Sequence, residues 1–100
     1  MKIEQLLRTM VNEGASDLHI KVGTFPSFRV NGDLEKLLKD KVSPEMMDDF
    51  LNDIMNRAQR TQFEETKELD FAVGARDMGR FRINVFRQRG TVAMVIRHIS

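Results

Sequence analysis

Two arginines near the C-terminus have the residue type and the spacing of an anion clamp. The segment 79–98, GRFRINVFRQRGTVAMVIRH, alternates apolar and polar residues in two halves, which predicts two strands. If Arg89–Gly90 between them forms a two-residue hairpin loop, counting outward places Arg82 directly opposite Arg97. Like charges at opposed strand positions destabilise a sheet, so this pair requires a compensating anion.

The compensating anion has two possible sources. It could be internal, an Asp or Glu from another element of the chain. It could instead be a phosphate, because the planar guanidinium of arginine bonds phosphate oxygens bidentately and two rigid strands hold such a clamp well. Both sources stay open, and so does the register, since Arg-Gly is a poorer hairpin signal than Asn-Gly and a bulge would shift the pairing by one residue.

A second polar pair lies near the N-terminus. In the segment 15–22 Leu18, Ile20 and Val22 point to one side, which places Asp17 and His19 together on the other face of a predicted strand. A carboxylate and an imidazole could perform acid-base chemistry. No motif places a Ser or Cys nucleophile beside them, and a chain with two histidines is a poor candidate for a metal site. No catalytic or metal-binding residue is predicted.

Phosphate-binding loops are missing from the sequence. None of the six glycines begins a G-x-x-x-x-G-K-[S/T] or a G-x-G-x-x-G pattern. The chain by itself is therefore predicted not to be an enzyme and not to hold a cofactor.

Length and composition indicate one small globular domain over residues 1–100, with 41% hydrophobic and 31% charged residues. The net charge of +1 excludes a globally basic nucleic-acid arm, but six arginines against the single acid Asp77 within 76–97 predict a locally positive surface. The absence of cysteine removes disulfides and thiolate metal sites. Residues 1–11 lack a continuous apolar run, so neither a signal peptide nor a membrane span is predicted there, and we expect a cytoplasmic protein.

The remaining elements follow from periodicity and capping residues. Helical spacing of apolar residues predicts three helices, which Ser43 and Asn56 cap in the second and third cases. Alternation predicts the strands, Asn31–Gly32 predicts a tight hairpin, and a loop is expected from Gly74 to Gly79. The order is helix, three strands, two helices, three strands. This order predicts an α+β domain whose sheet packs on helices with one face and carries arginines on the other.

Several stretches together resemble a known family. They are GASDLH at 14–19, FRVNGD at 28–33, FEETKELDF at 63–71 and GRFRINVF at 79–86. In order and spacing they resemble the N-terminal domain of the type IV pilus retraction ATPases, the PilT/PilU family of twisting motility, which is related to the type II secretion ATPases. The resemblance covers essentially all 100 residues.

The resemblance implies a PAS-like α+β domain, with an antiparallel or mixed sheet, that precedes a RecA-like ATPase domain in a homohexamer. The chain, which stops at Ser100 directly after a predicted strand, then looks like an excised or truncated N-terminal domain. The parent protein would be an ATPase motor that uses ATP and Mg²⁺. Its implied partners are the RecA-like domains of its own and neighbouring subunits and the pilus platform protein, at the cytoplasmic side of the inner membrane.

The resemblance also implies roles for particular residues. In the related secretion ATPases, arginines of this domain are expected to reach the nucleotide phosphates, and Arg82 and Arg97 match that pattern. Ser16, Asp17 and His19 belong to a family motif to which we assign no role. Arg87 and Arg89, near the turn, are expected to matter much less and to serve as controls.

Other functions remain as alternatives. Within the family, the chain could belong to a pilus assembly or type II secretion ATPase. A nucleic-acid binding module is a different class, because residues 79–86 distantly resemble an RRM strand and Phe86 shares the arginine face. The near-neutral charge and the lack of a second aromatic strand disfavour it. A PAS-like sensor would need a polar internal pocket, which the apolar core residues argue against.

Overall fold

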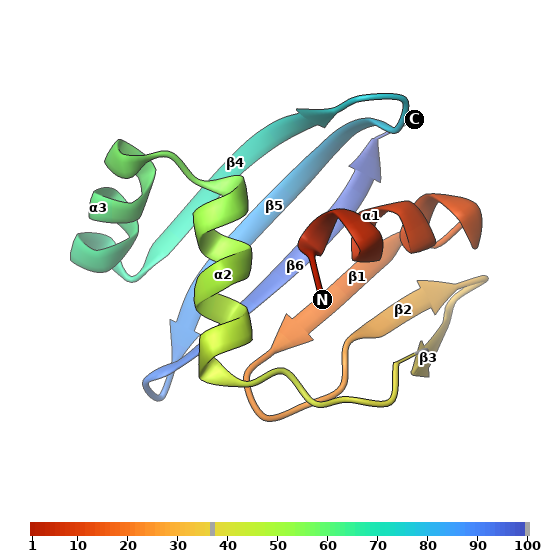
Figure 1. Ribbon diagram of the computed structural model, residues 1–100, viewed down its shortest axis with the longest axis horizontal. Helices are drawn as coiled ribbons and strands as arrows, with labels where there is room; N and C mark the ends of the chain where they lie inside the picture. The colour runs from red at the N-terminus through yellow and green to blue at the C-terminus, as the bar shows by residue number, and fades with distance from the viewer. Residues whose placement is uncertain (37, 100) are drawn as a thin grey trace.

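A computed structural model, which describes residues 1–36 and 38–99, shows one six-stranded sheet and three helices (Figure 1). The strand order is β3-β2-β1-β6-β5-β4, and every named pair is antiparallel. The elements are α1 Ile3–Asn12, β1 Asp17–Lys21, β2 Ser27–Val30, β3 Asp33–Lys36, α2 Pro44–Ile54, α3 Arg57–Thr66, β4 Glu68–Ala75, β5 Gly79–Gln88 and β6 Thr91–Ile99.

The helices lie on one side of the sheet. Figure 1 shows α1 and α2 across one face, while α3 lies beside the edge strand β4. The core fills the space between the sheet and the helices, with Phe28, Phe50 and Phe81 fully buried in it. The predicted α+β class, with helices packed on one face of the sheet, is therefore confirmed. None of the described helices is long and apolar enough to cross a membrane.

The predicted helix starts are confirmed by their capping hydrogen bonds. The Ser43 hydroxyl accepts a hydrogen bond from the Met46 backbone N–H at 3.1 Å, with Pro44 at the first helical position. The Asn56 side chain accepts one from the Gln59 backbone N–H at 2.8 Å. Both caps satisfy backbone donors that have no partner inside their helix.

The hairpin register derived from the sequence is also confirmed. Arg89 and Gly90 have φ values of 55° and 80°, as a two-residue type I′ loop requires, and the strands pair without a bulge. Arg82 is the direct cross-strand partner of Arg97. The two arginines are thus opposed as predicted, and the alternate residues of both strands are buried under the helices.

The loop between β4 and β5 is shorter than predicted. β4 continues through Gly74 to Ala75 and β5 begins at Gly79, so the connection is the three residues 76–78. Gly74 pairs with Arg80 as an ordinary strand residue, and the left-handed conformation in the turn belongs to Asp77, with φ 63°. The prediction of a six-residue loop was wrong because it read Gly74 as a strand end.

Candidate functional site

The face of the sheet opposite the helices carries a row of charged side chains. Arg29 of β2, Asp17 of β1, Arg97 of β6 and Arg82 of β5 are successive cross-strand partners. Asp70 of β4 lies diagonally next to Arg82, because its own partner is Asn84. We call these five residues the charge row. Its signs alternate except where Arg97 meets Arg82.

Both opposed arginines have an acidic partner on the strand beyond. Arg82 donates from Nε and Nη2 to the two carboxylate oxygens of Asp70, at 3.3 and 3.1 Å. Arg97 donates from Nε to Oδ1 of Asp17 at 3.3 Å. The internal anion, one of the two sources left open by the sequence, is therefore present. The β5–β6 hairpin alone could not reveal it, because neither acid belongs to that hairpin.

The two arginines nevertheless remain open to solvent. Their side chains are 65% (Arg82) and 71% (Arg97) exposed, and exposed ion pairs contribute little net stability. The hydrogen bond to Asp70 and its charge raise the pKa of the Arg82 guanidinium. Arg97 engages Asp17 through Nε alone, and its two terminal nitrogens have no hydrogen-bond partner in the described part of the chain. An anion approaching this face meets both guanidinium groups.

Asp17 is the least exposed member of the charge row, with 13% of its side chain accessible. The Ser16 hydroxyl donates to Oδ2 at 2.8 Å, and Arg29 Nε lies 3.8 Å from the same oxygen. Burial acts to raise the pKa of this carboxyl. The hydrogen bond from Ser16 and the hydrogen bond and charge of Arg97 outweigh burial, and the pKa is lowered. Asp17 therefore stays ionised.

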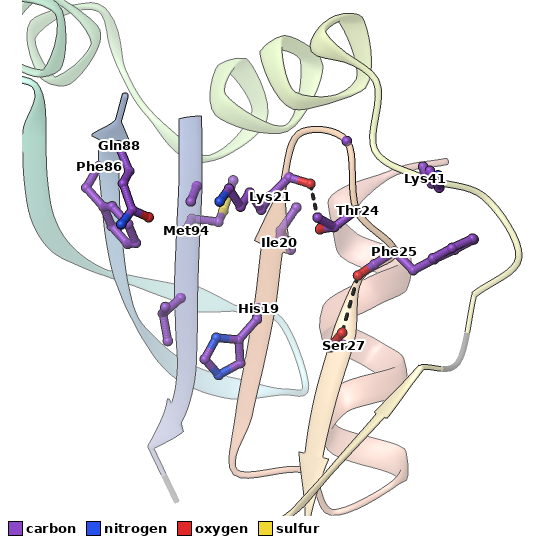
Figure 2. Close-up of a pocket in the computed structure, with 13 residues that line it drawn as sticks. His19, Ile20, Lys21, Thr24, Phe25, Ser27, Lys41, Phe86, Gln88 and Met94 are labelled. Carbon is purple, nitrogen blue, oxygen red and sulfur yellow. Dashed lines mark hydrogen bonds between the residues drawn. The ribbon is translucent and has the colours of Figure 1, made fainter. Parts of the chain in front are cut away.

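His19 does not form the acid-base pair with Asp17 that the strand pattern allowed. No hydrogen bond joins the two side chains among the described residues, and the Asp17 oxygens are engaged by Ser16 and the arginines. His19 instead lines a surface hollow of about 600 Å³ on the open face (Figure 2). Figure 2 shows His19 on β1 on one side of the hollow and Phe86 with Gln88 on the other. Phe86 thus lies on the arginine face as predicted.

Arg87 has a different place from the one expected. It points to the helix side of the sheet, where Nη2 lies 3.5 Å from Glu64 Oε2 and the guanidinium carbon lies 5.6 Å from the centre of the Phe63 ring. Nη1 also donates to the Gly90 carbonyl at 3.3 Å. Arg87 joins α3 to the long hairpin, so it is unsuitable as a control. Arg89, exposed in the turn, remains suitable.

Two curated relatives match over the whole chain, while no family model matches it. The type IV pilus ATPase PilU of Pseudomonas aeruginosa is 46% identical over 100 residues, all of this chain and 26% of PilU. The type IV pilus retraction ATPase PilT of the same organism is 37% identical over 99 residues, which are 99% of this chain and 29% of PilT. The chain is a PilT/PilU-like N-terminal domain. It spans about a quarter of the length of these relatives.

Solved structures agree with the relatives. The crystal structure of the pilus retraction motor PilT with bound ADP superposes on this PilT/PilU-like domain with a TM-score of 0.90 and 35% identity, covering the whole chain and 29% of that structure. The Legionella pneumophila ATPase DotB superposes with a TM-score of 0.82 at 24% identity over 98% of the chain and 28% of DotB, which shows a shared fold. The family resemblance read from the sequence motifs is confirmed.

Proposed function

We propose that residues 1–100 form the N-terminal domain of a hexameric type IV pilus retraction ATPase and supply two arginines to its nucleotide site. The observation that carries the proposal is the opposed, exposed pair Arg82 and Arg97 on the open face of a PilT/PilU-like domain. The names of the two curated relatives, both type IV pilus ATPases, favour this role over that of a type II secretion motor. DotB is similar in fold alone and carries no weight in this choice.

The chemistry of the pair suits a polyphosphate. A guanidinium can give two parallel N–H donors to two phosphate oxygens, and charge-assisted bonds of this kind are about twice as strong as neutral ones. In the free domain Asp17 and Asp70 each neutralise one arginine, so the face is stable without ligand. Phosphate oxygens gain charge during transfer, and donors fixed on strands stabilise that charge without reorganising.

The rest of the site would come from other parts of the parent protein. We propose a RecA-like motor domain after residue 100 that supplies the phosphate-binding loop. The described residues contain no cluster of three or more His, Cys, Asp or Glu that could hold a metal, so Mg²⁺ would be bound by that motor domain. The proposed partners are the motor domains of the same and neighbouring subunits and the pilus platform protein, at the cytoplasmic side of the inner membrane.

The test compares three variants of the parent protein that contains the motor domain. Arg82→Gln and Arg97→Gln should each lower the turnover number for ATP, while Arg89→Gln in the exposed turn should leave it unchanged. Removing one donor to developing charge costs about 100-fold in other enzymes, so losses of that order are expected. The same three substitutions in the 100-residue chain should leave its melting temperature close to that of the wild type. Wild-type turnover in both arginine variants would overturn the proposal.

A further inference from the structure

Asp17 lies between two arginines and engages them with different oxygens. Oδ1 accepts the hydrogen bond from Arg97 Nε, and Oδ2 faces Ser16 and Arg29. We propose that Asp17 is a positioning residue, which holds Arg97 by its inner nitrogen so that both terminal nitrogens are presented to a nucleotide phosphate. This inference rests on the proposed function of Arg97. It assigns a role to the Ser16–Asp17 part of the family motif.

Asp17 is well fixed for this role. It belongs to β1, which is paired on both sides, and Arg29 and Arg97 are its direct partners on those two sides. Its side chain is mostly buried, and the Ser16 hydroxyl holds the oxygen that Arg97 does not use. A carboxylate with so little freedom can set the orientation of a long side chain that is itself largely exposed.

The part of Arg97 that stays free is the part that a phosphate needs. A guanidinium offers pairs of parallel N–H donors, and the pair formed by the two Nη atoms matches two oxygens of one phosphate group. Asp17 occupies Nε and leaves both Nη atoms of Arg97 without a hydrogen-bond partner among residues 1–36 and 38–99. Asp70, by contrast, takes two nitrogens of Arg82 and is itself nearly half exposed. The two acids are therefore not equivalent.

Arg29 provides a matched control, because it is the other arginine beside Asp17. Its Nη1 donates to the Gly32 carbonyl at 2.9 Å, which ties it to the β2–β3 turn. Arg29→Gln removes a cation from Asp17 without touching Arg97. If Asp17 acted only by balancing charge on this face, changes at Arg29 and Asp17 would have comparable effects on turnover.

The experiment measures kcat and KM for ATP in the parent protein with Asp17→Asn, Arg97→Gln, the double variant and Arg29→Gln. Asp17→Asn should lower kcat about tenfold, a loss typical of removing a group that orients a functional ligand. The double variant should be no slower than Arg97→Gln alone, because both changes remove the same oriented donor. Arg29→Gln should retain wild-type kcat.

A second measurement tests the orientation without any ATPase assay. In the ¹⁵N-labelled 100-residue chain, the Nε–H resonance of Arg97 should be shifted and slow to exchange, and Asp17→Asn should move it to the position of a free arginine. Ser16→Ala, a milder change, should weaken the same signal and keeps the test valid if Asp17→Asn fails to fold.

The outcomes separate the inference from the function on which it rests. Impaired Arg97→Gln with unaffected Asp17→Asn, or losses that multiply in the double variant, would refute positioning while leaving the phosphate role of Arg97 intact. Wild-type kcat in Arg97→Gln would remove the proposed function, and the inference with it. An Arg97 Nε–H resonance indifferent to Asp17→Asn would refute the anchor directly.

Discussion

Arg87 gives the sharpest stability prediction, because it lies on the opposite face of the sheet from Arg82 and Arg97. Its side chain is 31% exposed and joins β5 to α3 through Glu64 and the Phe63 ring. Arg87→Ala should destabilise the domain, whereas Arg89→Gln, two residues further on, should not. The comparison tests whether the arginine-rich segment really divides into structural and ligand-facing residues.

The size of the effect follows from the interactions that the Arg87 side chain makes. The cation–π contact with the fully buried Phe63 is worth about 1 kcal/mol at a partly desolvated position. The ion pair with Glu64, the bond to the Gly90 carbonyl and the packed stem add about 1–2 kcal/mol. Nε of Arg87 is buried and has no partner among the described residues, which lowers the net value. The expected loss is about 2 kcal/mol, or about 8–16 °C in melting temperature for a domain of this size.

Thermal and urea unfolding of the 100-residue chain, followed by circular dichroism, measures this loss. Arg87→Met keeps most of the stem and should lose about half as much stability as Arg87→Ala. If Arg87→Ala melted together with the wild type and Arg89→Gln, the interactions with α3 would contribute nothing. The assignment of Arg87 to the structure would then be wrong.

Four further outcomes follow from the same structure. The 100-residue chain alone should neither bind ATP tightly nor hydrolyse it, and micromolar affinity in calorimetry would contradict this. Light scattering should show a monomer or a weak associate, since we attribute the hexamer largely to the motor domain; a stable ring would count against that view. The lowered pKa of Asp17 stabilises the fold above the unfolded carboxyl range, near about pH 4, and this contribution is lost as the pH falls through the lower folded value. Urea unfolding should therefore show a shallower acid-side loss of stability in Asp17→Asn, and identical acid limbs would refute this. Oligonucleotides should not bind with strong salt dependence, and a steep salt slope would revive the nucleic-acid alternative.

The long hairpin was predictable because the side-chain period of a strand is two. Once Arg89 and Gly90 are taken as the loop, each cross-strand pair follows by counting, and the opposition of Arg82 and Arg97 is among them. The caps at Ser43 and Asn56 were equally readable, since each is a local interaction within four residues. Local chemistry of this kind is written in neighbouring residues.

The strand order was not predictable in the same way. β1 lies beside β6 in the middle of the sheet, so Asp17 meets Arg97 across 80 residues of sequence. No periodic pattern specifies which strand lies beside which. Asp70 was within reach, because β4 and β5 form a hairpin whose register places it diagonally from Arg82, but misreading Gly74 as part of a loop hid that register. The two acids of the site were missed for these reasons.

The role proposed for this domain is to present Arg82 and Arg97 to nucleotide phosphates. The most direct test is a structure of the parent protein with a non-hydrolysable ATP analogue bound in the motor domain. We predict that nitrogens of both guanidinium groups lie within about 2.7–3.0 Å of phosphate oxygens, with Arg97 Nε still on Asp17. Phosphates bound with this face of the sheet turned away from them, and both arginines still paired only with Asp17 and Asp70, would contradict it.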